Sequence, residues 1–174
     1  MKKVLSSAVL CLLVLCILCI GLVNIDAVAF ATNAVDKDVD ISSRSAILME
    51  YQSGDVLFSK DETKHLPVAS MVKMMTILIS LEELQAGNVA FDTKITTTEN
   101  ASSMGGSQVF LDPYVDYSFE DLIKSVIMAS ANDASVALAE YFNGNEKAFT
   151  NRMNKRAKEL GMNVEIKPMS FDAC

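Results

Sequence analysis

Residues 70–87 read SMVKMMTILISLEELQAG and carry the clearest helical pattern of the chain. Apolar residues recur in it at steps of three and four, the spacing of one helix face, and a glycine closes it: Met71, Met74, Met75, Leu78, Leu81, Leu84 and Gly87. The pattern predicts a helix, with the methionines as core filler rather than a ligand-binding patch. Ser70 and Lys73 then lie about one turn apart on the same face.

The segments on either side add a hairpin and three more helices. Residues 45–51 (SAILMEY) and 56–58 are apolar and flank a turn, which predicts a β-hairpin that packs against the helix beginning near Ser70. Ser118 to Asp121 has the capping-box form and predicts a helix start. Further helices are expected over residues 133–142 and 148–160, each followed by a glycine.

The N-terminus predicts export. Lys2 and Lys3 precede an apolar run over residues 8–23, and small-residue A-x-A sites follow at residues 27–31. We therefore expect a signal peptide over residues 1–31, with an uncleaved membrane anchor as the alternative, and a polar linker over residues 32–43. The mature protein would be secreted or lie at the outer face of the cell membrane.

Composition excludes several classes of function. The net charge of −7 argues against a nucleic-acid partner. His65 is the only histidine, and Cys174 is the only cysteine outside the leader, so neither a zinc cluster nor a Ser-His-Asp triad can form. We expect no metal and no cofactor.

Two short motifs carry candidate chemistry. Ser70 supplies a hydroxyl nucleophile and Lys73 a base, whose pKa would fall if apolar neighbours such as Met71 and Met74 buried it. Between two expected helices, Ser130 could relay a proton and Asn132 could hold a substrate amide. Each motif also has a structural explanation, in which Ser70, Ser130 or Asn132 only caps a helix and Lys73 is a solvated side chain.

Taken together in one register over residues 44–162, these motifs resemble the serine-type D-alanyl-D-alanine carboxypeptidases, the low-molecular-mass penicillin-binding proteins. The resemblance rests on Arg44-Ser45-Ala46-Ile47-Leu48-Met49, Gly54-Asp55-Val56-Leu57, Leu66-Pro67-Val68-Ala69-Ser70-Met71-Val72-Lys73-Met74-Met75-Thr76, Ala101-Ser102-Ser103-Met104-Gly105-Gly106-Ser107, Ser130-Ala131-Asn132-Asp133-Ala134, Met153-Asn154 and Ala157-Lys158-Glu159-Leu160-Gly161-Met162.

The resemblance implies an α/β fold of the β-lactamase/transpeptidase type, in which a helical cluster flanks a sheet. It also implies an enzyme that cuts the terminal D-alanine from the peptidoglycan stem peptide and that β-lactam antibiotics acylate. By position, Ser70 would be the nucleophile, Lys73 the base, Ser130 the proton relay and Asn132 the substrate-binding amide.

The resemblance ends at Met162, after which the family continues to a Lys-Thr-Gly motif. Residues 163–174 read NVEIKPMSFDAC, which we interpret as a divergent tail from a frameshift or truncation, and we expect the 174-residue chain by itself to be inactive. A class A β-lactamase is an alternative enzyme. That family commonly has a glutamate followed four residues later by Asn, but here Met169 stands four residues after Glu165. A non-catalytic, penicillin-binding-like remnant is the other alternative.

Overall fold

The computed structural model describes residues 40–167. It divides the chain into two compact units, with the boundary between His65 and Leu66. The predicted signal peptide, most of the predicted linker and residues 168–174 lie outside the described residues. Among residues 40–167, no helix is both long and apolar enough to cross a membrane.

The first unit contains the predicted hairpin. Strand β1 (Ala46–Met49) pairs antiparallel with β2 (Val56–Lys60), with Leu48 opposite Phe58 and a register shift after Leu48. Its turn closes through two backbone hydrogen bonds, from the Gly54 N–H to the Glu50 carbonyl and from the Glu50 N–H to the Asp55 carbonyl. Gly54 has the positive φ of 76° that favours glycine. The hairpin is therefore confirmed. Its packing against the helix near Ser70 stays a prediction.

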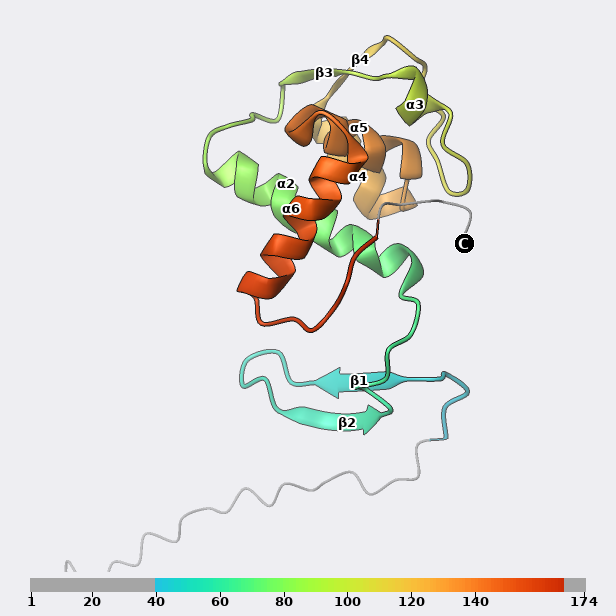
Figure 1. Ribbon diagram of the computed structural model, residues 1–174, viewed down its shortest axis with the longest axis vertical. Helices are drawn as coiled ribbons and strands as arrows, with labels where there is room; N and C mark the ends of the chain where they lie inside the picture. The colour runs from blue at the N-terminus through green and yellow to red at the C-terminus, as the bar shows by residue number, and fades with distance from the viewer. Residues whose placement is uncertain (1–39, 168–174) are drawn as a thin grey trace, which may run out of the picture. The chain divides into compact units, whose positions relative to one another are not determined.

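The second unit is a cluster of helices around α5 (Figure 1). Helix α5 (Asn132–Asn143) contacts α2 (Lys73–Gln85), α4 (Phe119–Ala129) and α6 (Glu146–Glu159). Its first eight residues are all buried, and the apolar ones join two clusters of buried side chains. Phe119, Leu122 and Leu138 are fully buried in one cluster, and Ile79, Phe149 and Met153 belong to the other.

The helix starts follow the predicted capping chemistry, with small shifts. The Ser118 hydroxyl accepts a hydrogen bond from the Asp121 N–H at 3.0 Å, as expected at the start of α4. Helix α6 begins two residues earlier than predicted, because the Asn145 side chain caps it by accepting a hydrogen bond from the Ala148 N–H at 2.8 Å. The stretch that begins at Ser70 opens as a 3₁₀ turn, η1 (Ala69–Val72), before α2.

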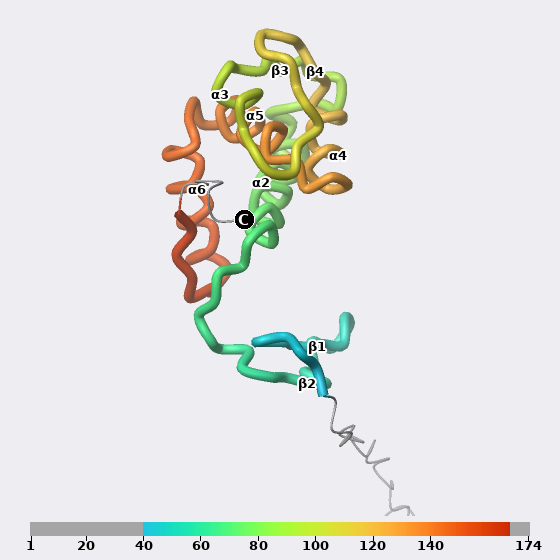
Figure 2. Tube along the Cα trace, turned by 90° about the vertical axis from the view of Figure 1, so that its right-hand side faces the viewer, coloured from blue at the N-terminus to red at the C-terminus, as the bar shows by residue number. Residues whose placement is uncertain are grey.

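The segment between α2 and α4 holds three elements that the sequence patterns did not predict. Strands β3 (Lys94–Thr96) and β4 (Asp116–Ser118) pair antiparallel, and the short helix α3 (Glu99–Ser102) follows β3. Residues 103–115 then run as a loop from α3 back to β4, and this loop passes beside α5 (Figure 2). The loop contacts Asn132 of the second motif.

Candidate active site

The first motif forms the expected side-chain contact. Ser70 lies in η1, and Lys73 is the first residue of α2. The Lys73 Nζ donates a hydrogen bond to the Ser70 Oγ at 3.1 Å, and the Lys73 side chain is only 4% exposed. A buried lysine next to a serine hydroxyl is the arrangement that a nucleophile and its base require.

The backbone around Ser70 argues against a mere capping role. The residue at the N-cap of η1 is Val68, and it makes no side-chain capping bond. Ala69 has φ = +46°, a left-handed conformation that is unfavourable for a residue other than glycine. Such conformations cluster at functional sites, where the surrounding structure holds them in place.

The burial of Lys73 does not come from the methionines that the sequence suggested. Met71 and Met74 are 66% and 67% exposed, so their prediction as core filler is wrong, whereas the prediction holds for Met75, which is buried. The buried face of α2 instead begins with polar residues at helical spacing, Lys73, Thr76 and Ser80. The Ser80 hydroxyl donates to the Thr76 carbonyl at 2.8 Å.

The second motif forms the corner between α4 and α5. Ser130 ends α4 in a left-handed conformation (φ = 52°), and Ala131 is the N-cap of α5 with no side-chain capping bond. The structural explanation of Ser130 or Asn132 as the cap of α5 is therefore wrong. Asn132 was expected in the loop, but it is the first residue of α5 and is 2% exposed.

The Asn132 amide is held by the loop from α3. Its Nδ2 donates a hydrogen bond to the Gly105 carbonyl at 2.7 Å, and its backbone N–H donates to the Ser107 carbonyl at 2.7 Å. Its Oδ1 is buried and has no hydrogen-bond partner among the described residues. A buried, unpaired carbonyl oxygen is uncommon and is expected where a protein holds a group for a function.

Asp133 supports this arrangement, although the sequence patterns gave it no role. Its fully buried carboxylate accepts hydrogen bonds from three backbone N–H groups: those of Val109 at 3.1 Å, Leu111 at 3.1 Å and Ala134 at 2.9 Å. An acidic residue directly after Ser130-Ala131-Asn132, at the start of an apolar helix, is the signal that could have indicated it.

Both motifs lie on elements that pack together. Helix α2, which begins at Lys73, contacts α4 and α5, and the corner at Ser130 and Ala131 joins these two helices. Within residues 40–167, no three histidine, cysteine or acidic side chains gather into a possible metal site. The chemistry available here is that of hydroxyl, amine and amide groups.

Comparison with known proteins identifies the family. The family model described as D-alanyl-D-alanine carboxypeptidase matches residues 31–166. The chain belongs to this family. The D-alanyl-D-alanine carboxypeptidase DacF of Bacillus subtilis (strain 168) is 40% identical over 148 residues, which cover 81% of this chain and 38% of that relative.

Solved structures confirm the fold class. The carboxypeptidase DacD of Francisella tularensis is 37% identical with a TM-score of 0.71, over 73% of this chain and 31% of that one. Penicillin binding protein 5 of Haemophilus influenzae is 32% identical with a TM-score of 0.72, over 76% and 40%. The fold is therefore of the β-lactamase/transpeptidase type, and the chain spans less than half the length of these relatives.

Proposed function

We propose that this protein is a serine-type carboxypeptidase that removes the terminal D-alanine from the peptidoglycan stem peptide through an acyl-serine intermediate. The observation that carries the proposal is the hydrogen bond from the buried Lys73 Nζ to the Ser70 Oγ. The names of the three relatives described above, two D-alanyl-D-alanine carboxypeptidases and a penicillin binding protein, support the same substrate class and sensitivity to β-lactam antibiotics.

The two motifs supply a side chain for each step of acylation. The Ser70 Oγ attacks the carbonyl carbon between the two D-alanines while its proton passes to the Lys73 Nζ. When the C–N bond breaks, the proton taken by Lys73 moves through the Ser130 hydroxyl to the leaving amine, and D-alanine departs. Water then attacks the ester carbonyl carbon: its hydroxyl stays on the released peptide as part of the new carboxyl group, and its proton returns to the Ser70 Oγ. Asn132 binds a substrate amide during acylation, from the position that the loop gives it.

The family comparison supports a carboxypeptidase and not a class A β-lactamase. Glu165, the residue that suggested the lactamase, is exposed and lies outside any helix or strand. The remaining alternative is a non-catalytic, penicillin-binding-like protein, and acylation distinguishes it from an enzyme.

The experiment measures acylation and turnover of the protein as the whole gene encodes it, whether or not that protein extends beyond residue 174. A fluorescent penicillin should label it, and Ser70→Ala should abolish labelling because the nucleophile is deleted. Lys73→Ala should slow labelling by about 10²–10⁴-fold, the usual contribution of a general base. D-alanine release from a Lys-D-Ala-D-Ala peptide should be lost in the same variants.

The matched control is Ser125→Ala. The Ser125 hydroxyl donates a hydrogen bond to the Asp121 carbonyl within α4 at 2.7 Å, so this variant should be labelled like the wild type. If the wild type is neither labelled nor releases D-alanine, the protein is a non-catalytic member of the family. If Ser70→Ala is labelled normally, another residue is the nucleophile.

We further propose that the protein acts outside the cytoplasmic membrane, in the cell envelope. The support is the expected signal peptide over residues 1–31, which precedes the core of the family match. N-terminal sequencing of the protein from its native host should find a start after Ala29 or Ala31. An intact N-terminus in the membrane fraction would indicate the uncleaved anchor instead.

A further inference from the structure

The loop that follows α3, residues 103–115, is hydrogen-bonded to the start of α5 at several points. Gly105 and Ser107 accept hydrogen bonds from Asn132, while the N–H groups of Val109 and Leu111 donate to the neighbouring Asp133. The residue between the first two contacts is Gly106, and its backbone therefore passes directly over the Asn132 side chain.

Gly106 leaves no room for a side chain. A Cβ at this position would lie 2.8 Å from the Asn132 Nδ2, closer than real Cβ atoms approach a neighbour. Its φ of +77° is also in the left-handed region. At Gly144 the φ is the same, +77°, but a Cβ would meet nothing within 4 Å. The two glycines share the backbone conformation and differ in the contact with Asn132.

We infer that Gly106 is a positioning residue for the proposed acylation reaction. Because it has no side chain, the Asn132 amide can keep its Nδ2 on the Gly105 carbonyl, and the amide then stands at a fixed place for the substrate. A methyl group at residue 106 must push this amide away from that place. The inference rests on the proposed function, in which Asn132 binds a substrate amide.

The first test compares two penicillins on the protein from its complete reading frame. Benzylpenicillin carries a side-chain amide, and 6-aminopenicillanic acid lacks it. Gly106→Ala should lower the second-order acylation rate constant for benzylpenicillin by about 10²-fold, the effect of misplacing a binding group by about 1 Å. It should lower the rate constant for 6-aminopenicillanic acid by less than about fivefold, since that compound offers no side-chain amide to Asn132.

The matched control is Gly144→Ala, which introduces the same backbone strain without a contact. It should leave the ratio between the two penicillins unchanged. A merely structural role of Gly106 would slow both penicillins equally. That result, or an effect of Gly106→Ala no larger than that of Gly144→Ala, would overturn the inference.

The second test does not need acylation. In thermal unfolding, Gly106→Ala should lower Tm more than Gly144→Ala does, by about 5 °C or more beyond it. In an Asn132→Ala background the contacting Nδ2 is absent, so the two glycine substitutions should cost the same. If Gly106→Ala does not fold, the double variant with Asn132→Ala should recover folding.

The two tests distinguish a failure of the proposed function from a failure of the role assigned to Gly106. If the wild type is not acylated, the proposed function is wrong, and the thermal cycle still decides whether Gly106 sets the Asn132 side chain. An equal loss of Tm in both backgrounds would show that Gly106 does not act through Asn132.

Discussion

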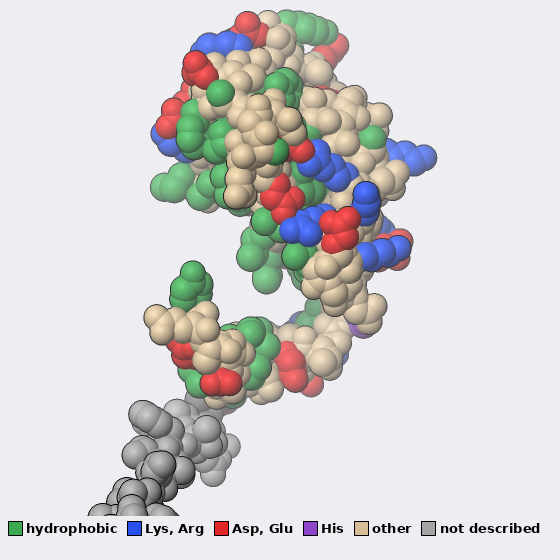
Figure 3. Space-filling view, turned by 90° about the vertical axis from the view of Figure 1, so that its left-hand side faces the viewer, with side chains coloured by type: hydrophobic (Ala, Val, Ile, Leu, Met, Phe, Trp, Pro, Cys, Tyr) green, Lys and Arg blue, Asp and Glu red, His purple; other side chains and the backbone are tan. Residues whose placement is uncertain are grey.

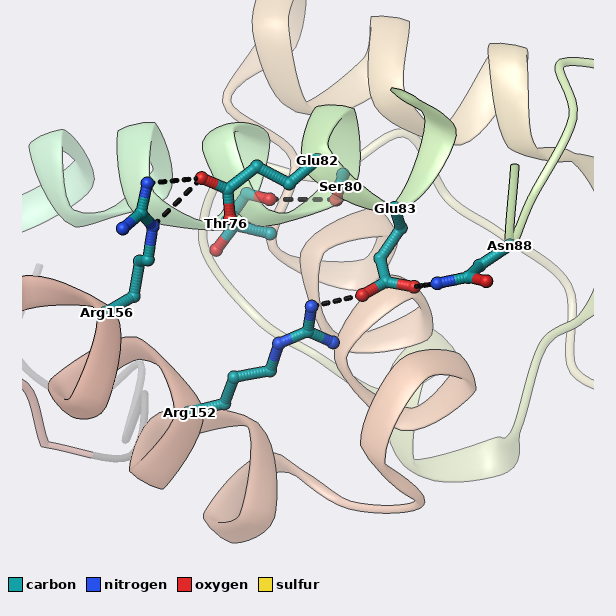
Figure 4. Close-up of polar contacts among 7 residues, drawn as sticks. All are labelled: Thr76, Ser80, Glu82, Glu83, Asn88, Arg152 and Arg156. Atoms are coloured by element: carbon teal, nitrogen blue, oxygen red, sulfur yellow. Dashed lines mark hydrogen bonds and ion pairs between the residues drawn. The ribbon is translucent and has the colours of Figure 1, made fainter. Parts of the chain in front are cut away.

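Two groups of polar side chains on the helical unit differ in what they bind. At the start of α5, Asn132 and Asp133 are buried, and their partners are backbone groups of a distant loop. Between α2 and α6, Glu82 pairs with Arg156 and Glu83 with Arg152, side chain to side chain (Figure 4).

The ion pairs between α2 and α6 lie at the surface. Acidic and basic side chains stand side by side on the face of the helical unit that Figure 3 shows. Arg156 reaches the Glu82 Oε1 at 2.8 Å and is 31% exposed, and Glu83 also accepts a hydrogen bond from Asn88 at 2.8 Å. The hydrogen bond from Arg152 lowers the pKa of Glu83, and Glu82 raises the pKa of Arg156.

The difference shows where the chain specifies a unique geometry. A buried side chain that binds backbone N–H groups fixes a loop in one register, because an unpaired buried group is costly. A partly exposed ion pair can rearrange in water, and salt screens it. Substitutions in the two groups should therefore change the free energy of unfolding by very different amounts.

The largest effect is expected at the start of α5. Asp133→Ala leaves the N–H groups of Val109, Leu111 and Ala134 without their acceptor, and unfolding by urea should show a loss of about 3 kcal/mol or more. Asp133→Asn keeps one acceptor oxygen and should recover part of this loss. Asp112→Ala, an exposed carboxylate in the same loop, is the control and should change stability little.

A loss for Asp133→Ala no larger than for Asp112→Ala would remove the distinction between the two groups. Hydrogen exchange gives a local measurement of the same contact. The Val109 and Leu111 amides should be protected in the wild type and should exchange faster in Asp133→Ala.

A smaller effect is expected for the ion pair between α2 and α6. Arg152→Ala should lower the free energy of unfolding by about 1 kcal/mol near neutral pH, because Glu83 and Arg152 are only partly exposed. Because the pKa of Glu83 is lowered, its ionised carboxylate contributes to the free energy of unfolding at pH values above the ordinary pKa of 4.5. The contribution is lost as the pH falls through the lowered pKa of the folded state.

The stability difference between wild type and Arg152→Ala should therefore shrink as the pH is lowered from about 7 to about 3. Lys155→Ala on the same helix is the control, since Lys155 is 80% exposed and 4.0 Å from Glu159. It should cost nothing measurable. A difference for Arg152→Ala that is independent of pH would show that the pair with Glu83 contributes nothing.

The smallest effect has the opposite sign. Burial raises the pKa of Glu146, and the neighbouring Glu140 raises it further, while the hydrogen bond from Asn100 lowers it. With a raised pKa, the folded state loses stability as the pH rises above 4.5. Glu146→Gln should remove this loss and stabilise the protein by less than about 1 kcal/mol near pH 7.

The gain from Glu146→Gln should disappear as the pH falls below the ordinary pKa of 4.5, where the wild-type carboxyl group is also neutral. Glu120→Gln on α4 is a control, since Glu120 pairs with Lys124 at 2.6 Å. Loss of this charge should not stabilise the protein. A stabilisation of both variants would point to overall negative charge rather than to burial at Glu146.

The helices near the two motifs could be predicted because their signals are local. The steps of three and four after Ser70, the capping box at Ser118 and the glycine after residue 143 act within one or two turns. Strands β3 and β4 have three residues each and are about twenty residues apart in the chain. Such short pairs carry too little periodicity to be recognised before the chain is folded.

The amino-acid sequence was enough to predict the hairpin, the main helices, the contact of Ser70 with Lys73 and, through the joint order of the motifs, the family. These depend on spacing along the chain. The packing of the helices sets which face of η1 and α2 is buried, so that Met71 and Met74 are exposed while Lys73 is buried. The tertiary structure also decides that the loop around Gly106 meets Asn132 and Asp133. These contacts join residues more than twenty positions apart, and burial and close approach between distant segments leave no period in the sequence.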